Sequence, residues 1–202
     1  MTHWKAGDVV PARTLSTIHA ATVSIPDSAW LTHLQFRRFA GCPVCNLHLR
    51  SFVRRHDEIT HAGVREVVFF HSAQDELLEH AADLPFAVIA DPGKHYYAEF
   101  GAETGKRALF DPRAFGAIVK AIGVSIVGVL KRGHRVPPIF PEGGRYGLPA
   151  DLLIDRVGLV LAVKYGEHAD DQWSVEDMLA VAREVPAPAG PGAGVVRGGL
   201  DR

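Results

Sequence analysis

Strand-like and helix-like hydrophobic patterns alternate along the first half of the chain. Residues 30–39 form an apolar run, and the apolar positions of residues 43–61 then recur at helical intervals. Residues 64–71 are β-branched and aromatic, as in a buried parallel strand, and a second helical pattern follows at residues 74–82, with Ser72 as its predicted N-cap. This order predicts a right-handed strand–helix–strand crossover unit.

The second half continues with short elements separated by clear turn signals. Residues 86–90 are a third apolar run, and a short predicted helix follows at residues 94–100. Two apolar strands within residues 148–165 are joined by a turn between Asp155 and Gly158, which predicts an antiparallel hairpin. The chain is therefore predicted to have an α/β fold, with a central mixed β-sheet flanked by helices.

The remaining segments complete the predicted domain. Residues 9–25 predict short strands or an extended arm, and Ser174 begins a closing helix with an acidic capping box. Residues 111–130 carry a broad apolar stripe at helical spacing, which predicts an inserted helix buried against the sheet or against a second subunit of a homodimer. Residues 186–202 lack the means to bury a core, so we predict one domain over residues 1–185 and a disordered tail.

Composition limits the classes of function. The chain has 202 residues, of which 47% are hydrophobic and 22% charged, and its formal net charge is -1. Because this is the balance of an ordinary globular protein without a long basic stripe, there is no electrostatic reason to expect nucleic acid. The first residues lack the apolar core of a signal peptide, and no stretch is long and apolar enough to cross a membrane. We therefore expect a cytoplasmic protein without membrane or nucleic-acid partners.

The two cysteines of the chain carry its strongest chemical signal. Cys42 and Cys45 stand at Cys-x-x-Cys spacing at the start of a predicted helix, which points to a redox dithiol. Gly41 can turn the chain there, and Pro43 suits the first helical position because its missing N–H would have no partner. The unpaired amides and the positive end of the helix dipole favour a thiolate, so we expect an exposed Cys42 with a lowered pKa as the attacking sulfur. Cys45, one turn further on, would then resolve the adduct as an intramolecular disulfide.

Two other interpretations of the cysteine pair remain open. The pair could be half of a zinc site, but such a site needs two more ligands and the chain has no second cysteine pair. Of the nearby histidines, His48 follows on the same predicted helix, and His56 and His61 lie too far along it to reach its start, so we predict no metal. The thiols could also be inert and buried, although their place between Gly41 and a helix argues against this.

Three stretches resemble the thioredoxin fold and, more narrowly, the peroxiredoxin-like branch of the alkyl hydroperoxide reductase and thiol-specific antioxidant family. They are residues 36–45 (Phe-Arg-Arg-Phe-Ala-Gly-Cys-Pro-Val-Cys), residues 86–101, and residues 148–155 (Leu-Pro-Ala-Asp-Leu-Leu-Ile-Asp) with Gly158 and the Tyr-Gly pair at 165–166. Together they span nearly the whole predicted domain. The resemblance implies reduction of hydroperoxides or protein disulfides by a dithiol–disulfide cycle without a bound cofactor, and a thioredoxin-type or glutathione-linked electron donor.

The resemblance also implies a cis-proline that faces the dithiol. The matching position is Pro149, where a cis bond would present the backbone of Leu148 to an extended substrate. We therefore include both residues among the substrate-binding candidates. From the sequence pattern alone, Pro149 is a proline at the start of a strand.

Two positions depart from the family pattern. Peroxiredoxins resemble one another in a Pro-x-x-x-Thr-x-x-Cys signature whose threonine helps to seat the peroxide, and here Phe39 and Gln35 stand at the threonine and proline positions. No motif anchors the peroxide-binding arginine of the family, so Arg38 is our substrate-binding candidate by proximity, beside Arg37 and Arg145. The missing hydroxyl makes a protein disulfide reductase without peroxidase activity the second hypothesis.

Two further expectations complete the functional prediction. His71 ends a predicted strand near the dithiol edge, and we expect a hydrogen-bonded structural role for it. A non-catalytic alternative is a thioredoxin-fold scaffold that binds a partner through residues 111–130. The leading prediction is a thiol peroxidase or thiol-disulfide oxidoreductase in which Cys42 is the nucleophile and Cys45 the resolving thiol.

Overall fold

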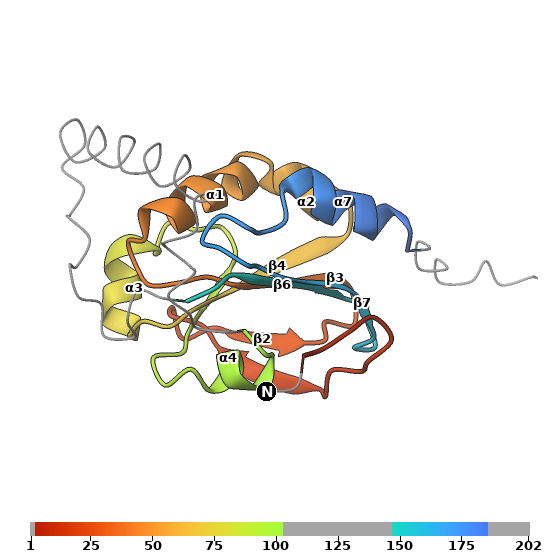
Figure 1. Cartoon of the computed structure of the whole chain (residues 1–202), viewed down its shortest axis with the longest axis horizontal. Coiled ribbons are helices and arrows are strands. Elements are labelled where there is room, and N and C mark those ends of the chain that lie inside the picture. Colours follow the sequence, from red (N-terminus) through yellow and green to blue (C-terminus); the bar gives the residue numbers. More distant parts are fainter. Residues whose placement is uncertain (1–2, 103–146, 186–202) are drawn as a thin grey trace, which may run out of the picture.

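A five-stranded mixed β-sheet forms the centre of the computed structural model, which describes residues 3–102 and 147–185 (Figure 1). Its strands are β3 (Leu31–Phe36), β4 (Val64–Phe70), β5 (Ala87–Ala90), β6 (Ala150–Ile154) and β7 (Val160–Tyr165). They lie in the order β5-β4-β3-β6-β7. β4 is parallel to both β3 and β5, whereas β6 is antiparallel to both β3 and β7. This confirms the predicted mixed sheet.

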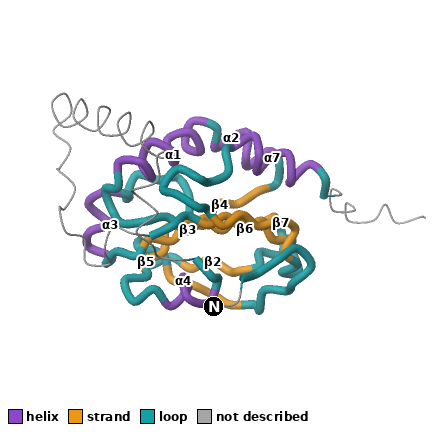
Figure 2. The backbone as a smooth tube through the Cα atoms, viewed as in Figure 1, coloured by secondary structure: helices purple, strands orange, loops and turns teal. Residues whose placement is uncertain are grey.

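Helices cover one face of the sheet and a second, smaller sheet covers the other (Figures 1 and 2). The covering helices are α1 (Pro43–Arg54), α2 (His56–His61) and α7 (Val175–Arg183). The opposite face carries the antiparallel pair β1 (Arg13–Ser16) and β2 (Thr22–Ile25), together with α4 (His95–Glu99). A further helix, α3 (Gln74–His80), packs beside β5.

The side chains of β3 alternate between the two layers because successive residues of a strand point to opposite faces. Leu34 and Phe36 pack into the core on the β1–β2 side, where the Phe36 ring stacks on Phe69 with centroids 4.6 Å apart. Leu31 packs into the helix-side core with Phe52. Between these apolar positions the same strand carries His33 and Gln35, both buried.

Most predicted elements are confirmed, with differences in their bounds. The strand predicted over residues 30–39 ends at Phe36. The single helix predicted over residues 43–61 is two helices, because Arg55 leaves the helical conformation with φ -113° and ψ 18°. Ser72 is not the N-cap of α3, since Ala73 takes that position. The Ser72 hydroxyl instead accepts a hydrogen bond of 2.9 Å from the Ala40 N–H.

The predictions that rest on local signals are confirmed closely. The carboxylate of Asp155 accepts hydrogen bonds from two N–H groups of the β6–β7 turn, and Gly158 has φ +95°, a conformation that favours glycine. Ser174 and Asp177 form a reciprocal capping box at the start of α7.

Some predictions fall outside the described residues. These are the inserted helix at residues 111–130, Arg145 and the tail at residues 186–202. Within the two described ranges, no helix combines the length and the apolar character that a membrane crossing requires.

Candidate active site

The two cysteines lie at the N-terminus of α1, as their spacing predicts. Cys42 is the N-cap, Pro43 occupies the first turn, and Gly41 turns the chain with φ +71°. Both thiols are free, and the Cys45 N–H donates a hydrogen bond of 3.5 Å to the Cys42 Sγ. The Cys42 sulfur therefore accepts from one of the amides that a helix N-terminus leaves unpaired.

Burial of the dithiol corrects the expectation of an exposed sulfur. Cys42 is 0% exposed, and it packs with Cys45 among Phe39, Val44 and Leu47. This apolar contact covers only part of its surroundings, because the Arg38 Nη2 donates a hydrogen bond of 2.9 Å to the Cys42 Sγ. Arg38 is itself only 3% exposed. A buried cation in contact with a sulfur stabilises the thiolate over the thiol.

The two thiols titrate as a pair. Burial opposes ionisation of Cys45, but the hydrogen bond with the Cys42 side chain and the charge of Arg38 together lower the Cys45 pKa to about 6. Burial, followed by the hydrogen bond with Cys45 and its charge, raises the pKa of Cys42 well above its ordinary value. Two sulfurs in contact cannot both carry a charge, so the pair loses one proton readily and retains the other. The expectation of a lowered pKa at Cys42 alone is wrong, because the easily lost proton belongs to the pair.

The backbone around the dithiol is fixed by contacts from neighbouring elements. The N–H of His71, the residue after β4, donates a hydrogen bond of 3.1 Å to the Arg38 carbonyl. The Tyr97 hydroxyl lies 2.9 Å from the Phe69 carbonyl oxygen and within hydrogen-bond distance of the Arg37 carbonyl oxygen. The Arg38 guanidinium also lies 5.8 Å from the Phe39 ring centroid. These contacts hold the segment between β3 and α1 in place.

The predicted cis-proline is not at Pro149. Among the described residues the cis peptide bond is Ile25–Pro26, so the Leu148–Pro149 bond is trans. The Pro149 carbonyl accepts a hydrogen bond of 2.8 Å from the Gly166 N–H, and β6 begins at the next residue. Pro149 is therefore a proline at a strand start, the arrangement that its sequence pattern alone indicates. Leu148 is buried, at 8% exposure.

The chain before β6 nevertheless returns to the dithiol, at Gly147. A Cβ on this glycine would lie 2.8 Å from the His71 Nε2 and 3.4 Å from the Arg38 Cγ. The backbone of Gly147 thus passes close to both side chains. Of the substrate-binding candidates, Arg38 contacts the sulfur directly.

A buried set of charges, which was not predicted from the sequence, lies on the helix side of the sheet. We define this charge ladder as His33, Glu66, Asp151 and Arg37, all of which are buried. His33 contacts Glu66 through Nδ1 at 2.8 Å and Asp151 through Nε2 at 3.2 Å. The Arg37 Nη2 donates to the Asp151 carboxylate at 2.6 Å. Each charged group in the ladder has an opposite charge beside it, which burial requires.

The ladder stabilises its own ionised state. Burial alone would lower the pKa of His33, but the charge of Glu66 and hydrogen bonds with Asp151 and Glu66 raise it to about 9. Burial opposes ionisation of Asp151, yet the charge of Arg37 and the contact with His33 lower its pKa below the usual range. With two cations and two anions, the charge ladder has no net charge. The sequence signal was the run of polar residues in an apolar strand, at His33, Gln35 and Arg37.

The proposed zinc ligands do not gather at the dithiol. Among residues 3–102 and 147–185, no three His, Cys, Asp or Glu side chains converge as metal ligands would. His48, one turn after Cys45, has its Nε2 3.3 Å from the Arg37 Nη2. Burial and the charge of Arg37 lower its pKa well below the usual value, so His48 is neutral and can accept this hydrogen bond.

Comparison with solved structures supports the fold, whereas sequence comparisons do not add to it. No family model matches the chain, and no curated protein matches it. The structure resembles peroxidoxin BcpB from Mycobacterium tuberculosis with a TM-score of 0.64 at 16% identity, over 92% of this chain and 100% of that one. It resembles a peroxiredoxin-like protein from Aquifex aeolicus with a TM-score of 0.61 at 13% identity, over 91% and 89% of the two chains. It also resembles a cysteine-to-serine mutant of PrxQ from Xylella fastidiosa, with a TM-score of 0.61 at 8% identity, over 91% and 97%. The chain therefore has the thioredoxin-like fold found in peroxiredoxins.

Proposed function

We propose that the protein is a thiol-dependent oxidoreductase that reduces hydroperoxides through a dithiol–disulfide cycle of Cys42 and Cys45. The observation that carries this proposal is the 2.9 Å contact between the buried Arg38 Nη2 and the Cys42 Sγ. It places a permanent positive charge against a sulfur at a helix N-terminus, with a second thiol one turn away. The likeness of the fold to peroxiredoxins agrees with this chemistry.

The cycle has three balanced steps. The Cys42 thiolate attacks one oxygen of the hydroperoxide, so that an S–O bond forms, the O–O bond breaks and the other oxygen leaves as an alcohol after taking a proton. The Cys45 sulfur then attacks Cys42, forming the disulfide and releasing water that carries the Cys45 proton. A thioredoxin-type or glutathione-linked donor returns two electrons and two protons. We place this reaction in the cytoplasm, where such donors keep thiols reduced.

The lowered pKa of the pair supplies the nucleophile at neutral pH. With one ionisation at a pKa of about 6, most molecules carry one thiolate at pH 7. Because the Cys42 Sγ receives the hydrogen bonds from Arg38 and from the Cys45 N–H, we assign the attack to Cys42. Attack by Cys42 requires the remaining proton of the coupled pair to sit on Cys45, from which it passes to the departing water.

Single-cysteine variants test the proposal. We expect the wild type to consume hydrogen peroxide with dithiothreitol as the recycling thiol, and Cys42→Ser to fall to the rate of the protein-free control. Cys45→Ser keeps the first step, so it should accumulate a sulfenic acid that dimedone traps at Cys42. Near-ultraviolet circular dichroism of both variants checks their packing. Peroxide consumption by Cys42→Ser at the wild-type rate would contradict the proposal.

A protein disulfide reductase is the second candidate function, favoured by Phe39. This side chain packs against the dithiol where the family pattern has a threonine hydroxyl. Reduction of insulin disulfides by the wild type, without peroxide consumption, would replace the peroxidase proposal with this one. Stoichiometric zinc that survives mild chelation would contradict both.

A further inference from the structure

His71 is a buried polar side chain whose ring has no hydrogen-bond partner within residues 3–102 and 147–185. It follows β4 and is 0% exposed. Among the described residues, neither its Nδ1 nor its Nε2 has a partner. The sequence predicts a hydrogen-bonded structural role for His71, and its backbone N–H has such a role through its hydrogen bond to the Arg38 carbonyl. Burying an imidazole without a partner reduces stability, so its retention needs another reason.

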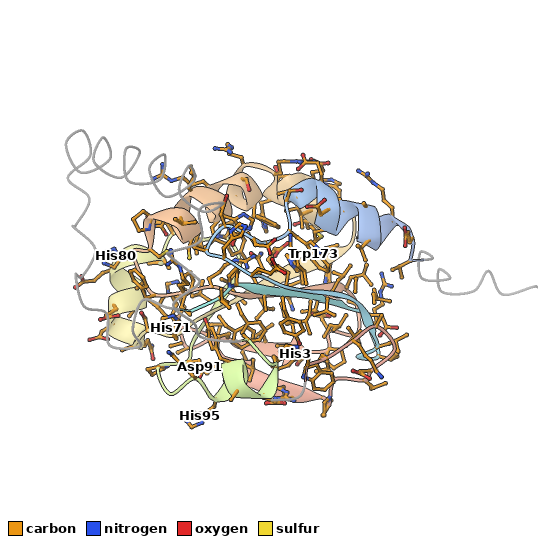
Figure 3. The ribbon with its side chains drawn as sticks, viewed as in Figure 1. His3, His71, His80, Asp91, His95 and Trp173 are labelled. Atoms are coloured by element: carbon orange, nitrogen blue, oxygen red, sulfur yellow. The ribbon has the colours of Figure 1, made fainter. Side chains whose placement is uncertain are left out.

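The ring is held in position by aromatic neighbours rather than by polar ones. The Tyr97 ring meets it edge to face with centroids 5.5 Å apart, and the Phe39 ring lies 6.5 Å away. Figure 3 shows His71 inside the fold, apart from the peripheral histidines His80 and His95. The Tyr97 and Phe39 rings therefore bound the His71 imidazole.

The backbone of Gly147 passes directly against the ring. The Nε2 of His71 and the Cγ of Arg38 both border the place that a Cβ on Gly147 would occupy, at 2.8 Å and 3.4 Å. Any side chain at Gly147 would therefore press on His71. The Arg38 guanidinium extends from the same place to the Cys42 Sγ. The His71 ring, which has no partner in the described part of the chain, and the Arg38 side chain thus border the same glycine, and Arg38 connects this place to the Cys42 sulfur.

The charge state of His71 suits a hydrogen-bond donor. Burial, then the charges of Lys94 and Arg38, lower the pKa of His71 to about 4. The imidazole is therefore neutral at pH 7, with one N–H to donate. A second cation next to Arg38 is thereby avoided.

We propose that His71 is a catalytic residue, whose ring N–H donates a hydrogen bond to the leaving oxygen of a hydroperoxide attacked by Cys42. The inference rests on the proposed function. As the S–O bond forms and the O–O bond breaks, negative charge develops on the leaving oxygen. The ring N–H stabilises that charge until the oxygen takes a proton from water, and His71 itself ends the step unchanged. His71 thereby takes the place of the hydroxyl that Phe39 cannot offer.

Two substitutions and a comparison of two reagents test this role. His71→Met removes the ring donors and fills the volume with a flexible apolar chain, whereas His71→Gln keeps an amide donor near the position of Nε2. The single-turnover rate of thiol oxidation by hydrogen peroxide is measured beside the rate of alkylation by iodoacetamide. Alkylation needs the same thiolate but no donor to a leaving oxygen. His80→Gln, on α3, is the matched control.

We expect His71→Met to lower the peroxide rate about 100-fold while its alkylation rate stays within about twofold of the wild type. His71→Gln should recover at least about a tenth of the peroxide rate, and His80→Gln should keep all of it. His71→Leu takes the place of the methionine variant if that variant does not fold.

Equal losses with peroxide and iodoacetamide, or no loss with either, would overturn the role of His71 while the proposed function stands. A wild type that alkylates readily but does not react with hydrogen peroxide would overturn the proposed function itself, and the role of His71 with it.

Discussion

Two buried polar regions lie close together in this fold and differ in how their groups are paired. In the charge ladder, His33, Glu66, Asp151 and Arg37 each contact an opposite charge. At the dithiol corner, which we define as Arg38, Cys42, Cys45 and His71, one cation faces a pair of thiols, and the His71 ring has no partner among the described residues.

This difference separates groups that hold the fold from groups prepared for chemistry. Paired charges in a low-dielectric interior keep their ionisation states and tie their strands together. The ladder joins β3, β4 and β6 in this way. At the dithiol corner, by contrast, an ionised sulfur and a neutral hydrogen-bond donor can both interact with a reacting molecule. The ladder should therefore control stability, and the dithiol corner should control reactivity.

The largest expected effect is on stability, from breaking the ladder. Asp151→Asn removes the anion between His33 and Arg37, so we expect the free energy of unfolding to fall by about 3–5 kcal/mol. Urea denaturation measures the change. Asp171→Asn is the control, because its partly exposed pair with Lys164 should contribute at most about 1 kcal/mol. Similar losses in the two variants would remove the distinction between the ladder and an ordinary surface pair.

The next effect is a dependence of stability on pH, from His33. Its pKa is raised to about 9 in the folded state, so its contribution is complete below the unfolded pKa near 6.5 and is lost as the pH rises through 9. We expect stability to fall by about 3 kcal/mol over this range. Because the dithiol has a lowered pKa, its ionisation raises stability as the pH rises, opposite to the effect of His33. Urea denaturation is therefore measured with both cysteines replaced by serine, which removes the dithiol contribution.

His33→Gln in the same double-serine background provides the comparison for this titration. The variant should lose the decline between neutral and alkaline pH. If the stability of His33→Gln still declines by the same amount, the decline comes from other groups, and His33 is neutral when buried.

The smallest expected effect is on reactivity, from Arg38. Arg38→Met removes the charge against the Cys42 sulfur, so the first pKa of the dithiol should rise and iodoacetamide alkylation at pH 7 should slow about tenfold. Unfolding free energy at pH 5 should change little, because the dithiol can take up a proton. Arg50→Met, an exposed position on the same helix as the dithiol, is the control. Equal alkylation rates in the two variants would show that Arg38 does not activate the sulfur.

Local signals made most of the fold predictable. The Cys-x-x-Cys pair behind Gly41, the turn at Asp155 and the cap at Ser174 each depend on residues a few positions apart, and each is where the sequence indicates. The bounds of elements were less predictable. At both places a side chain contacts a distant part of the chain: Arg55 pairs with Glu176, and the Ser72 hydroxyl accepts from the Ala40 N–H instead of capping α3.

The candidate site was predictable only in part, because its key contacts cross the sheet. His33 meets Asp151 across 118 positions of sequence, through the antiparallel register of β3 and β6. The approach of Gly147 to His71 depends on the same return of the chain. The Cys-x-x-Cys spacing placed the dithiol, whereas the family resemblance gave a cis bond at Pro149 that the structure lacks.

The central claim is that the buried dithiol loses one proton below neutral pH. Thiolate absorbance at 240 nm tests it most directly, because no reagent has to reach the buried sulfurs. The absorbance of the reduced wild type is measured against pH and corrected with the variant that has both cysteines replaced by serine. The account predicts one thiolate per chain appearing with a midpoint near pH 6, well before the second. A first ionisation at about 8.5 or above, as for an ordinary cysteine, would contradict it.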